Sequence, residues 1–435
     1  MNFKETIDKN CYRAQIWRAW FDRFSTVRLT GRASRWKLLT FSQSRGPVIR
    51  FGWPFCFLTI LLKLSFLMES LMRKALIAFP LTALILISCF FAKPVPANPS
   101  EKISGIPASR AADSIHSIIE ANRTIYSEVI VERLAVTISL KASENWKNEN
   151  TLPLPAQFLA FSSHMIKEKG LDMDYRLTSL WPINVNNKPK SKFEESALQT
   201  VLKDPSKIQT AIISLKGKKV FTAIYPDLAV TKACASCHNK HPNSPKRDFK
   251  LGDVMGGIVI TFPIDDSGKN AEDPLIAPEV VADYLHAVLE SDRTVYLKYI
   301  VNRLQNKNIA FASEHWWEEN ALLLPAQFLL NASDLIIEKQ LGFDFKLISL
   351  WPINSHNGAA NEFERKGLEN VVRNPVRPFI GVSKLGGKKY FQALYPDFAV
   401  SAACVSCHNT HPKSPKSDFK LNDVMGGIVL TFPVE

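Results

Sequence analysis

An internal repeat is the feature that most constrains how this chain can fold. Residues 111–264 align with residues 281–434 at a constant offset of 170 without a gap, and about half of the aligned positions are identical. A period this long exceeds the unit of a solenoid, so each copy is expected to be a domain with its own core. The sequence therefore predicts two domains, at residues 105–264 and 280–435, joined by a polar linker at 265–279.

Hydrophobic periodicity within a copy indicates both helices and strands. Apolar residues at helical spacing predict a long first helix over about 111–138, and Pro155 and Gly170 suit the start and end of a second helix. The remaining elements expected in copy one are a strand at 176–183, a helix at 192–202, a hairpin of 209–215 with 218–225, a loop holding the cysteines, and a strand at 256–262. This order predicts the α+β class, with helices packed on an antiparallel sheet.

The positive net charge is concentrated at the N-terminus. Residues 1–97 hold 15 of the 54 Lys and Arg residues and only 4 of the 41 Asp and Glu residues. The rest of the chain is therefore nearly neutral, which argues against nucleic acid as a partner.

The N-terminal segment has the pattern of an export signal. Residues 72–97 combine a basic start with an apolar run and then small residues. Leu86–Cys89 fits a lipoprotein signal with lipidation at Cys89, Val95–Ala97 fits an ordinary cleavage site, and Ala75–Phe91 is just long enough for an uncleaved membrane anchor. All three interpretations place the protein outside the cytoplasm, in the periplasm. Residues 1–71 have no role before a signal, so we expect the true start at Met68 or Met72; a second membrane helix is the alternative.

All cysteines after residue 97 fall in two C-x-x-C-H motifs. The motifs occupy matching places in the two copies, and they consist of Cys234, Cys237 and His238, and of Cys404, Cys407 and His408. C-x-x-C-H is the attachment signature of c-type haem: the thiols bond the two vinyl groups, and the histidine is the proximal iron ligand. Structural zinc needs four ligands and each copy has one cysteine pair, so zinc and a redox dithiol are weaker alternatives. We therefore expect two covalently bound c-type haems.

The distal iron ligand is less clear. His116 and His286 occur at equivalent positions on the predicted first helix, and they are the candidate distal ligands; an ordinary helix histidine is the alternative. His241 and His411 lie too close to the proximal ligand, so we expect them to orient a propionate or the loop backbone. Core packing is favoured over ligation for Met255 and Met425. The shared cations are candidates for neutralising propionates, with solvated surface charges as the alternative: Lys246, Lys250, Arg123, Lys416, Lys420 and Arg293.

The block C-x-x-C-H-N-x-H-P-x-S-P-K-x-D-F-K-L-x-D-V-M-G-G, with the upstream L-P-A-Q-F and W-P-I-N segments, resembles the c-type haem PAS-like domain. That family includes a free cyanobacterial cytochrome and the extracytoplasmic sensory parts of bacterial kinases and cyclases. The resemblance covers both copies. It implies two tandem PAS-like domains, each an antiparallel sheet flanked by helices with a covalent haem loop. It also implies haem attachment at both C-x-x-C-H motifs.

The chain departs from this family at the sixth iron ligand. The resemblance implies a distal cysteine in the free cytochrome, and no cysteine remains here for that role. The distal ligand therefore does not carry over.

Two functions from different classes agree with these features. The first is a dihaem cytochrome that transfers single electrons between redox partner proteins. The second is a haem-based redox or gas sensor, which we expect to signal through a partner protein. Catalysis requires acid–base groups that converge on an open iron position, and the sequence indicates no such set of groups.

Overall fold

The computed structural model describes residues 104–215, 217–264 and 272–434. The expected signal, the expected start at Met68 or Met72, and residues 265–271 of the expected linker lie outside these ranges. Within them, no helix is both long and apolar enough to cross a membrane.

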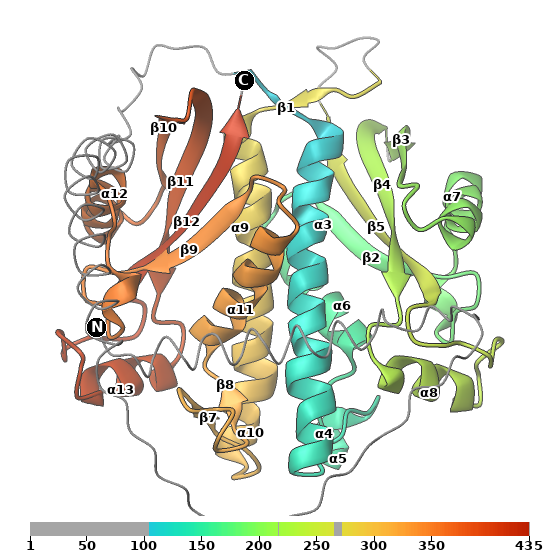
Figure 1. The fold of residues 1–435 in the computed structure, drawn as a ribbon, viewed down its shortest axis with the longest axis horizontal. Helices are drawn as coiled ribbons and strands as arrows, with labels where there is room; N and C mark the ends of the chain where they lie inside the picture. The colour runs from blue at the N-terminus through green and yellow to red at the C-terminus, as the bar shows by residue number, and fades with distance from the viewer. Residues whose placement is uncertain (1–103, 216, 265–271, 435) are drawn as a thin grey trace, which may run out of the picture. The chain divides into compact units, whose positions relative to one another are not determined.

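Each copy is an antiparallel four-stranded sheet flanked by helices (Figure 1). The elements of copy one are β1 (Ile106–Pro107), α3 (Ala108–Ile125), the π-helix η1 (Tyr126–Glu132), α4 (Arg133–Thr137), α5 (Trp146–Glu149), α6 (Pro155–Glu168), β2 (Asp174–Thr178), the 3-10 helix η2 (Val185–Asn187), α7 (Lys192–Lys203), β3 (Gln209–Leu215), β4 (Lys218–Leu228), α8 (Lys232–Lys240) and β5 (Val254–Pro263). The strand order is β2-β5-β4-β3. The predicted α+β class is therefore confirmed.

Copy two repeats this plan. Its elements are β6 (Leu275–Ile276), α9 (Pro278–Val295), the π-helix η3 (Tyr296–Val301), α10 (Asn302–Asn306), β7 (Ala312–Ser313), β8 (Leu322–Leu323), α11 (Pro325–Glu338), β9 (Asp344–Ile348), the 3-10 helix η4 (Ser355–Asn357), α12 (Glu362–Arg373), β10 (Phe379–Leu385), β11 (Lys388–Phe398), α13 (Ala402–Thr410) and β12 (Val424–Val434). The strand order is β9-β12-β11-β10. Two residues of the expected linker, Leu275 and Ile276, pair with β1 of copy one.

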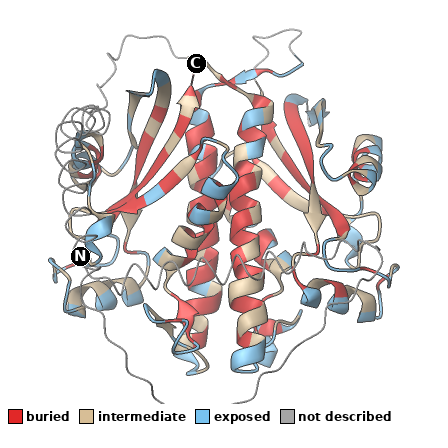
Figure 2. Cartoon of the chain, in the orientation of Figure 1, coloured by how far each residue is buried: buried red, intermediate tan, exposed pale blue. Residues whose placement is uncertain are grey.

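Each sheet is packed on both faces. Leu198 and Val201 of α7 pack against Ile224 and Val259 on one face of the copy-one sheet. The other face meets α3, where the ring of His116 stacks on Tyr225. Figure 2 shows buried residues concentrated along the sheets and the two long helices.

Two details differ from the predicted elements. The first helix is continuous over the predicted region, but Tyr126–Glu132 has π-helical geometry, which a pattern of apolar spacing does not reveal. The predicted strand at 176–183 begins earlier and ends at Thr178. It ends there because the Ser179 hydroxyl binds the Met255 carbonyl at 2.7 Å and accepts from the Trp181 N–H at 3.0 Å, which turns the chain away from the sheet.

The two copies pack together through their long helices. A row of four buried rings runs from Tyr126 through Phe158 and Phe328 to Tyr296, with centroid distances of 4.5, 5.9 and 4.5 Å. Each copy also donates an arginine to the backbone of the other: Arg133 bonds the Ala321 carbonyl, and Arg303 bonds the Thr151 carbonyl. The copies therefore meet across a buried aromatic interface, and each copy also has a core cluster of its own between its sheet and α7 or α12.

Asn122 and Asp292 occupy equivalent positions in the two copies, and they meet at the interface. Asn122 donates to the Asp292 carboxylate at 2.6 Å, and both side chains are fully buried. Burial raises the pKa of Asp292 to about 7, against nearby hydrogen-bonding groups of Ser162, Asn122 and Tyr175, which lower it. The folded protein therefore keeps this carboxyl protonated in mildly acidic solution.

We expect Asp292→Asn to remove a pH dependence of stability. The folded state holds the Asp292 proton up to about pH 7, whereas the unfolded chain releases it near pH 4. The folded state binds more protons in this window, so the free energy of unfolding of the wild type should fall as pH rises, by about 1.4 kcal/mol per pH unit. Urea unfolding at several pH values should show that the free energy of unfolding of the variant, relative to that of the wild type, increases across this window. An equal slope for both proteins contradicts the prediction, and exposed Asp172→Asn is the matched control.

Candidate functional site

The C-x-x-C-H motif of each copy lies on a short helix, α8 or α13, so the expected loop conformation is wrong. The reason is a helix cap on the preceding residue: the side chain of Thr231 accepts from the Cys234 N–H at 3.4 Å, and Ser401 does the same for Cys404. At the other end, the His241 N–H donates to the Cys237 carbonyl at 2.9 Å.

The helix brings the motif side chains to one face. Cys234, Cys237 and His238 are spaced i, i+3 and i+4, which are neighbouring positions on a helix surface. Both thiols are free; Cys234 is partly buried, and Cys237 is exposed. The Thr231 hydroxyl lies 3.3 Å from the Cys234 sulfur. Cys404 and Cys407 repeat this arrangement on α13.

An apolar wall stands beside each motif helix. Around α8 it comprises Ala229, Ala235, Phe249 and Met255, with Trp181 packed against it. The His238 ring meets Phe249 edge to face, with ring centroids 5.9 Å apart. Asn239 fixes Phe249 in place, because its amide bonds the Phe249 carbonyl at 2.8 Å and the Phe249 N–H at 2.9 Å. Copy two has the same edge-to-face pair, His408 and Phe419.

Burial sets the protonation of the motif residues. It lowers the pKa of His238 and of His408 below the ordinary histidine value, with smaller effects from neighbouring charges. It raises the pKa of the Cys237 and Cys407 thiols. Each histidine is therefore held in the neutral form, which offers a nitrogen lone pair to a metal.

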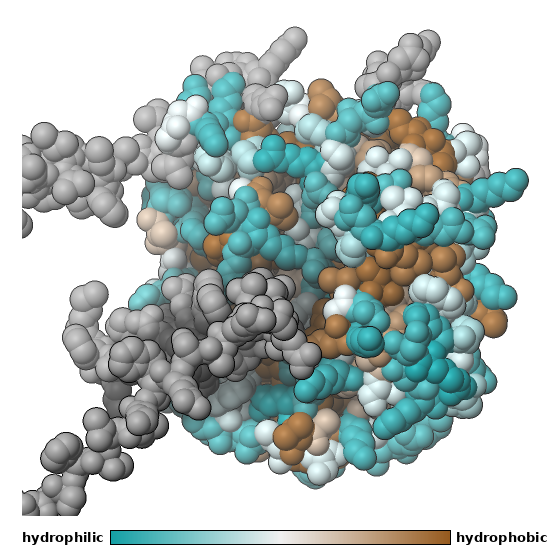
Figure 3. All heavy atoms as spheres, turned by 45° about the vertical axis from the view of Figure 1, so that its right-hand side comes forward, coloured by the Kyte–Doolittle hydropathy of each residue, from teal (hydrophilic) through white to brown (hydrophobic). Residues whose placement is uncertain are grey.

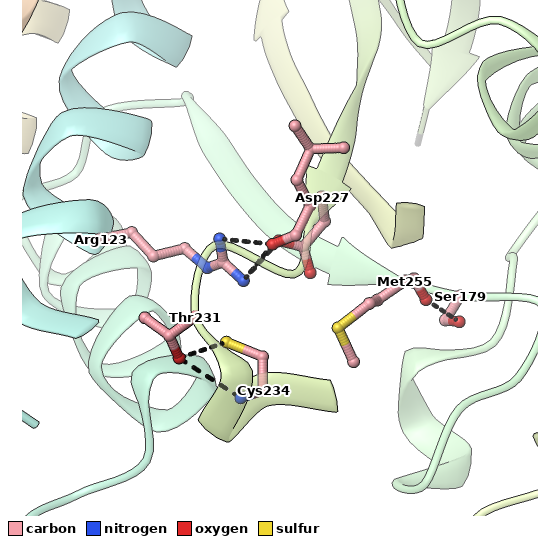
Figure 4. Close-up of polar contacts among 7 residues, drawn as sticks. Arg123, Ser179, Asp227, Thr231, Cys234 and Met255 are labelled. Carbon is pink, nitrogen blue, oxygen red and sulfur yellow. Dashed lines mark hydrogen bonds and ion pairs between the residues drawn. The ribbon is translucent and has the colours of Figure 1, made fainter. Parts of the chain in front are cut away.

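A buried ion pair lies beside the motif helix (Figure 4). The guanidinium of Arg123, on α3, is 2.7 Å from the Asp227 carboxylate at the end of β4, and their side chains are 9% and 13% exposed. Arg293 and Asp397 form the equivalent pair in copy two. The alternative of solvated surface charges is therefore wrong for both arginines.

The two lysine pairs differ in their environments. Lys246 pairs with Asp248 at 2.5 Å, and its ammonium lies 5.2 Å from the Trp181 ring centroid and 5.0 Å from that of Phe249. Lys416 has the same position in copy two, with Asp418 and two aromatic rings. Lys250 and Lys420 are exposed.

His116 and His286 lie between the first helix and the sheet, where their side chains are 12% and 15% exposed. The His116 ring stacks on Tyr225 at 4.0 Å, and its Nδ1 lies 3.7 Å from Glu120. Burial lowers the pKa of His116, and of His286, to about 4. The Nε2 of both rings is buried and has no hydrogen-bond partner among the described residues. The role of these two histidines as distal ligands stays a prediction.

The remaining predicted residues lie at the edge of the site. His241 Nδ1 accepts from the Asn243 N–H at 3.1 Å, so this ring orders the loop backbone, one of the two roles expected for it. His411 does the same for Lys413. Met255 and Met425 are buried in the apolar walls beside the thiols, as core packing predicts.

Sequence reasoning missed three components of the site. They are the capping Thr231, the aromatic partner Phe249 and the acidic partner Asp227. Thr231 could have been predicted from the sequence, because threonine is a common N-cap residue whose side chain binds the N–H three positions later, here that of Cys234. Asp227 had none, because its partner Arg123 lies about a hundred residues away.

These residues fit a covalently attached haem. Each copy offers two free thiols and a neutral histidine on one helix face, beside an apolar wall that suits a porphyrin. The Nδ1 of His408 is buried without a hydrogen-bond partner among the described residues, so that ring is not committed elsewhere. Among the same residues, no group of three or more His, Cys, Asp and Glu side chains is placed to hold a bare metal ion.

The fold and the site define a class: an α+β protein of two tandem copies, each with a C-x-x-C-H helix beside a buried Arg–Asp pair. The sequence model of the Tll0287-like family matches residues 106–263 and 277–433. The chain therefore belongs to the Tll0287-like family, in two tandem copies. A search of curated proteins finds no match.

We expect Asp227→Ala to be strongly destabilising. The change leaves the Arg123 charge buried and unpaired, which typically costs about 3–5 kcal/mol. Urea unfolding measures the effect, and Asp172→Ala is the control, because its pair with Lys218 is 61% and 67% exposed and worth about 0–1 kcal/mol. Equal effects of the two variants would overturn the assignment of a buried pair.

Proposed function

We propose that the protein is a dihaem c-type cytochrome that transfers single electrons between partner proteins in the periplasm. Each copy is then a c-type haem PAS-like domain. The observation that carries the proposal is the pair of C-x-x-C-H helices, in which free thiols and a neutral histidine share one face in both copies. The export pattern of residues 72–97 supports the compartment.

The chain supplies three things to such a site. Thr231 caps α8 and thereby fixes Cys234 for thioether attachment. His238 is held against Phe249 in the neutral form that binds iron. A bound haem supplies reversible one-electron chemistry.

Nearby charges adjust that chemistry. Asp227, His241 and Arg123 are the charged or titratable groups that act on His238. Fixed charges near a haem tune its reduction potential, together with burial. Because both charges of the Arg123–Asp227 pair are buried, they are screened little by solvent.

A second function, a redox or gas sensor, is favoured by the ion pair of Arg123 and Asp227, which connects the candidate site to α3. Arg123 joins the end of β4, next to the motif helix, to α3, and α3 packs against the other copy. Immediately after α3, the helix takes π geometry, which is often found at functional sites. A change at the haem that alters the Arg123–Asp227 pair would therefore reach the interface.

Visible spectra with and without carbon monoxide decide between the two functions. The mature region is exported in a host with c-type haem maturation, and ferric and ferrous spectra are recorded. Low-spin spectra that carbon monoxide leaves unchanged support the electron carrier, because two strong axial ligands leave no site for the gas. A spectral shift with carbon monoxide contradicts that function and supports the sensor. His116→Ala and His286→Ala should create such a shift if these residues are the distal ligands.

A further inference from the structure

The second cysteine of each motif is exposed, which locates a surface for electron exchange. Cys237 and Cys407 are both solvent-accessible. Cys237 and Cys407 would hold a bound haem at the protein surface, where a docking partner could exchange electrons with it. The two surfaces are equivalent by duplication, so any difference between them reflects divergence after the repeat arose.

Two segments make up each surface. In copy one they are the motif segment 229–253 and the loop 139–151, which we call the copy-one face. Glu144 of the loop lies 3.6 Å from His241 of the motif segment, so the two segments adjoin. Residues 399–423 and 309–321 form the copy-two face, where Glu314 lies 3.5 Å from His411.

The two faces have opposite net charge. On the copy-one face, the motif segment has five Lys and Arg against two Asp and Glu, and the loop has two of each. On the copy-two face, the motif segment has three against two, and the loop has no Lys or Arg and three Glu. The net charge is therefore +3 on the copy-one face and −2 on the copy-two face. The sheets of the two copies nevertheless have the same strand order.

The added cations of copy one are placed around the motif helix. Lys232 and Lys240 lie at the two ends of α8 and are exposed, as is Arg247 in the segment that follows. Arg247 is held beside the end of α8, because it bonds the Pro242 carbonyl at 2.9 Å. The equivalent residues of copy two are uncharged: Ala402, Thr410 and Ser417. Figure 3 turns copy one toward the viewer and shows hydrophilic side chains gathered over its lower part.

We propose that the copy-one face is the docking surface for a small acidic electron-transfer protein, whereas the copy-two face does not bind such a partner. The inference rests on the proposed function, because it treats the exposed thiols as the place of electron exchange. Complementary charge steers a partner to the correct surface and fixes its orientation. Exposed Glu144 and Asp248 interrupt the cations, and this mixed pattern suits a protein surface better than a uniform array of phosphates.

Exchanging residues between the copies tests the proposal with little risk to folding, since each replacement already occurs at the equivalent position. The loss variant is Lys232→Ala with Lys240→Thr and Arg247→Ser. The reciprocal gain variant is Ala402→Lys with Thr410→Lys and Ser417→Arg. Binding of an acidic plant-type ferredoxin to the haem-loaded chain is measured by calorimetry at low ionic strength, and a basic cytochrome c serves as the control probe.

The wild type should bind one ferredoxin, and the loss variant should bind it about tenfold more weakly. The gain variant should bind a second ferredoxin, and added salt should weaken all of these complexes. Equal binding by the wild type and the loss variant overturns the proposal. Tighter binding of duplex DNA or phosphatidylserine vesicles than of ferredoxin overturns it too, in favour of a general polyanion surface. Absorbance of the same samples reports haem content, so absence of haem refutes the proposed function separately.

Discussion

The packing of the two copies along their first helices is the interaction on which the rest of the structure depends. The buried row of Tyr126, Phe158, Phe328 and Tyr296 connects the two halves across their interface. At the centre, Asn122 meets Asp292, so this shared surface is polar at one point and asymmetric. Copy one places Ser162 and Tyr175 near that point, where copy two has Ala332 and Phe345. Duplication within one chain permits such an asymmetry, which a pair of identical chains does not.

The same helices position the candidate sites. Arg123 extends from α3 to Asp227 at the end of β4, and the motif helix begins five residues later, at Lys232. The glycine pair of β5 contributes to this geometry. A Cβ atom on Gly256 would lie 2.3 Å from the Thr178 carbonyl oxygen, so glycine allows β2 to approach and Ser179 to bind the Met255 carbonyl. Met255, whose carbonyl Ser179 binds, is also a member of the apolar wall beside Cys234.

Comparing the sequence with itself predicts the repeat, and short-range signals such as apolar spacing, Pro155 and Gly170 predict the α+β class and most elements. A loop is predicted for the cysteine segment, but this segment is a helix that Thr231 caps. The interface and the Arg123–Asp227 pair depend on residues far apart in the chain. No short-range pattern encodes those contacts. The spacing of the motif residues identifies them in the sequence, whereas the environments of His116 and Arg123 depend on how the helix packs on the sheet.

We propose that each copy carries one covalently attached haem at its own motif helix. Intact-mass spectrometry of denatured protein, matured in a c-type haem host, tests it most directly because only covalent groups survive denaturation. We expect the wild type to carry the added mass of two haems. Cys234→Ala with Cys237→Ala, and the matched Cys404→Ala with Cys407→Ala, should each carry one. A wild-type mass equal to that of the polypeptide alone would contradict the account.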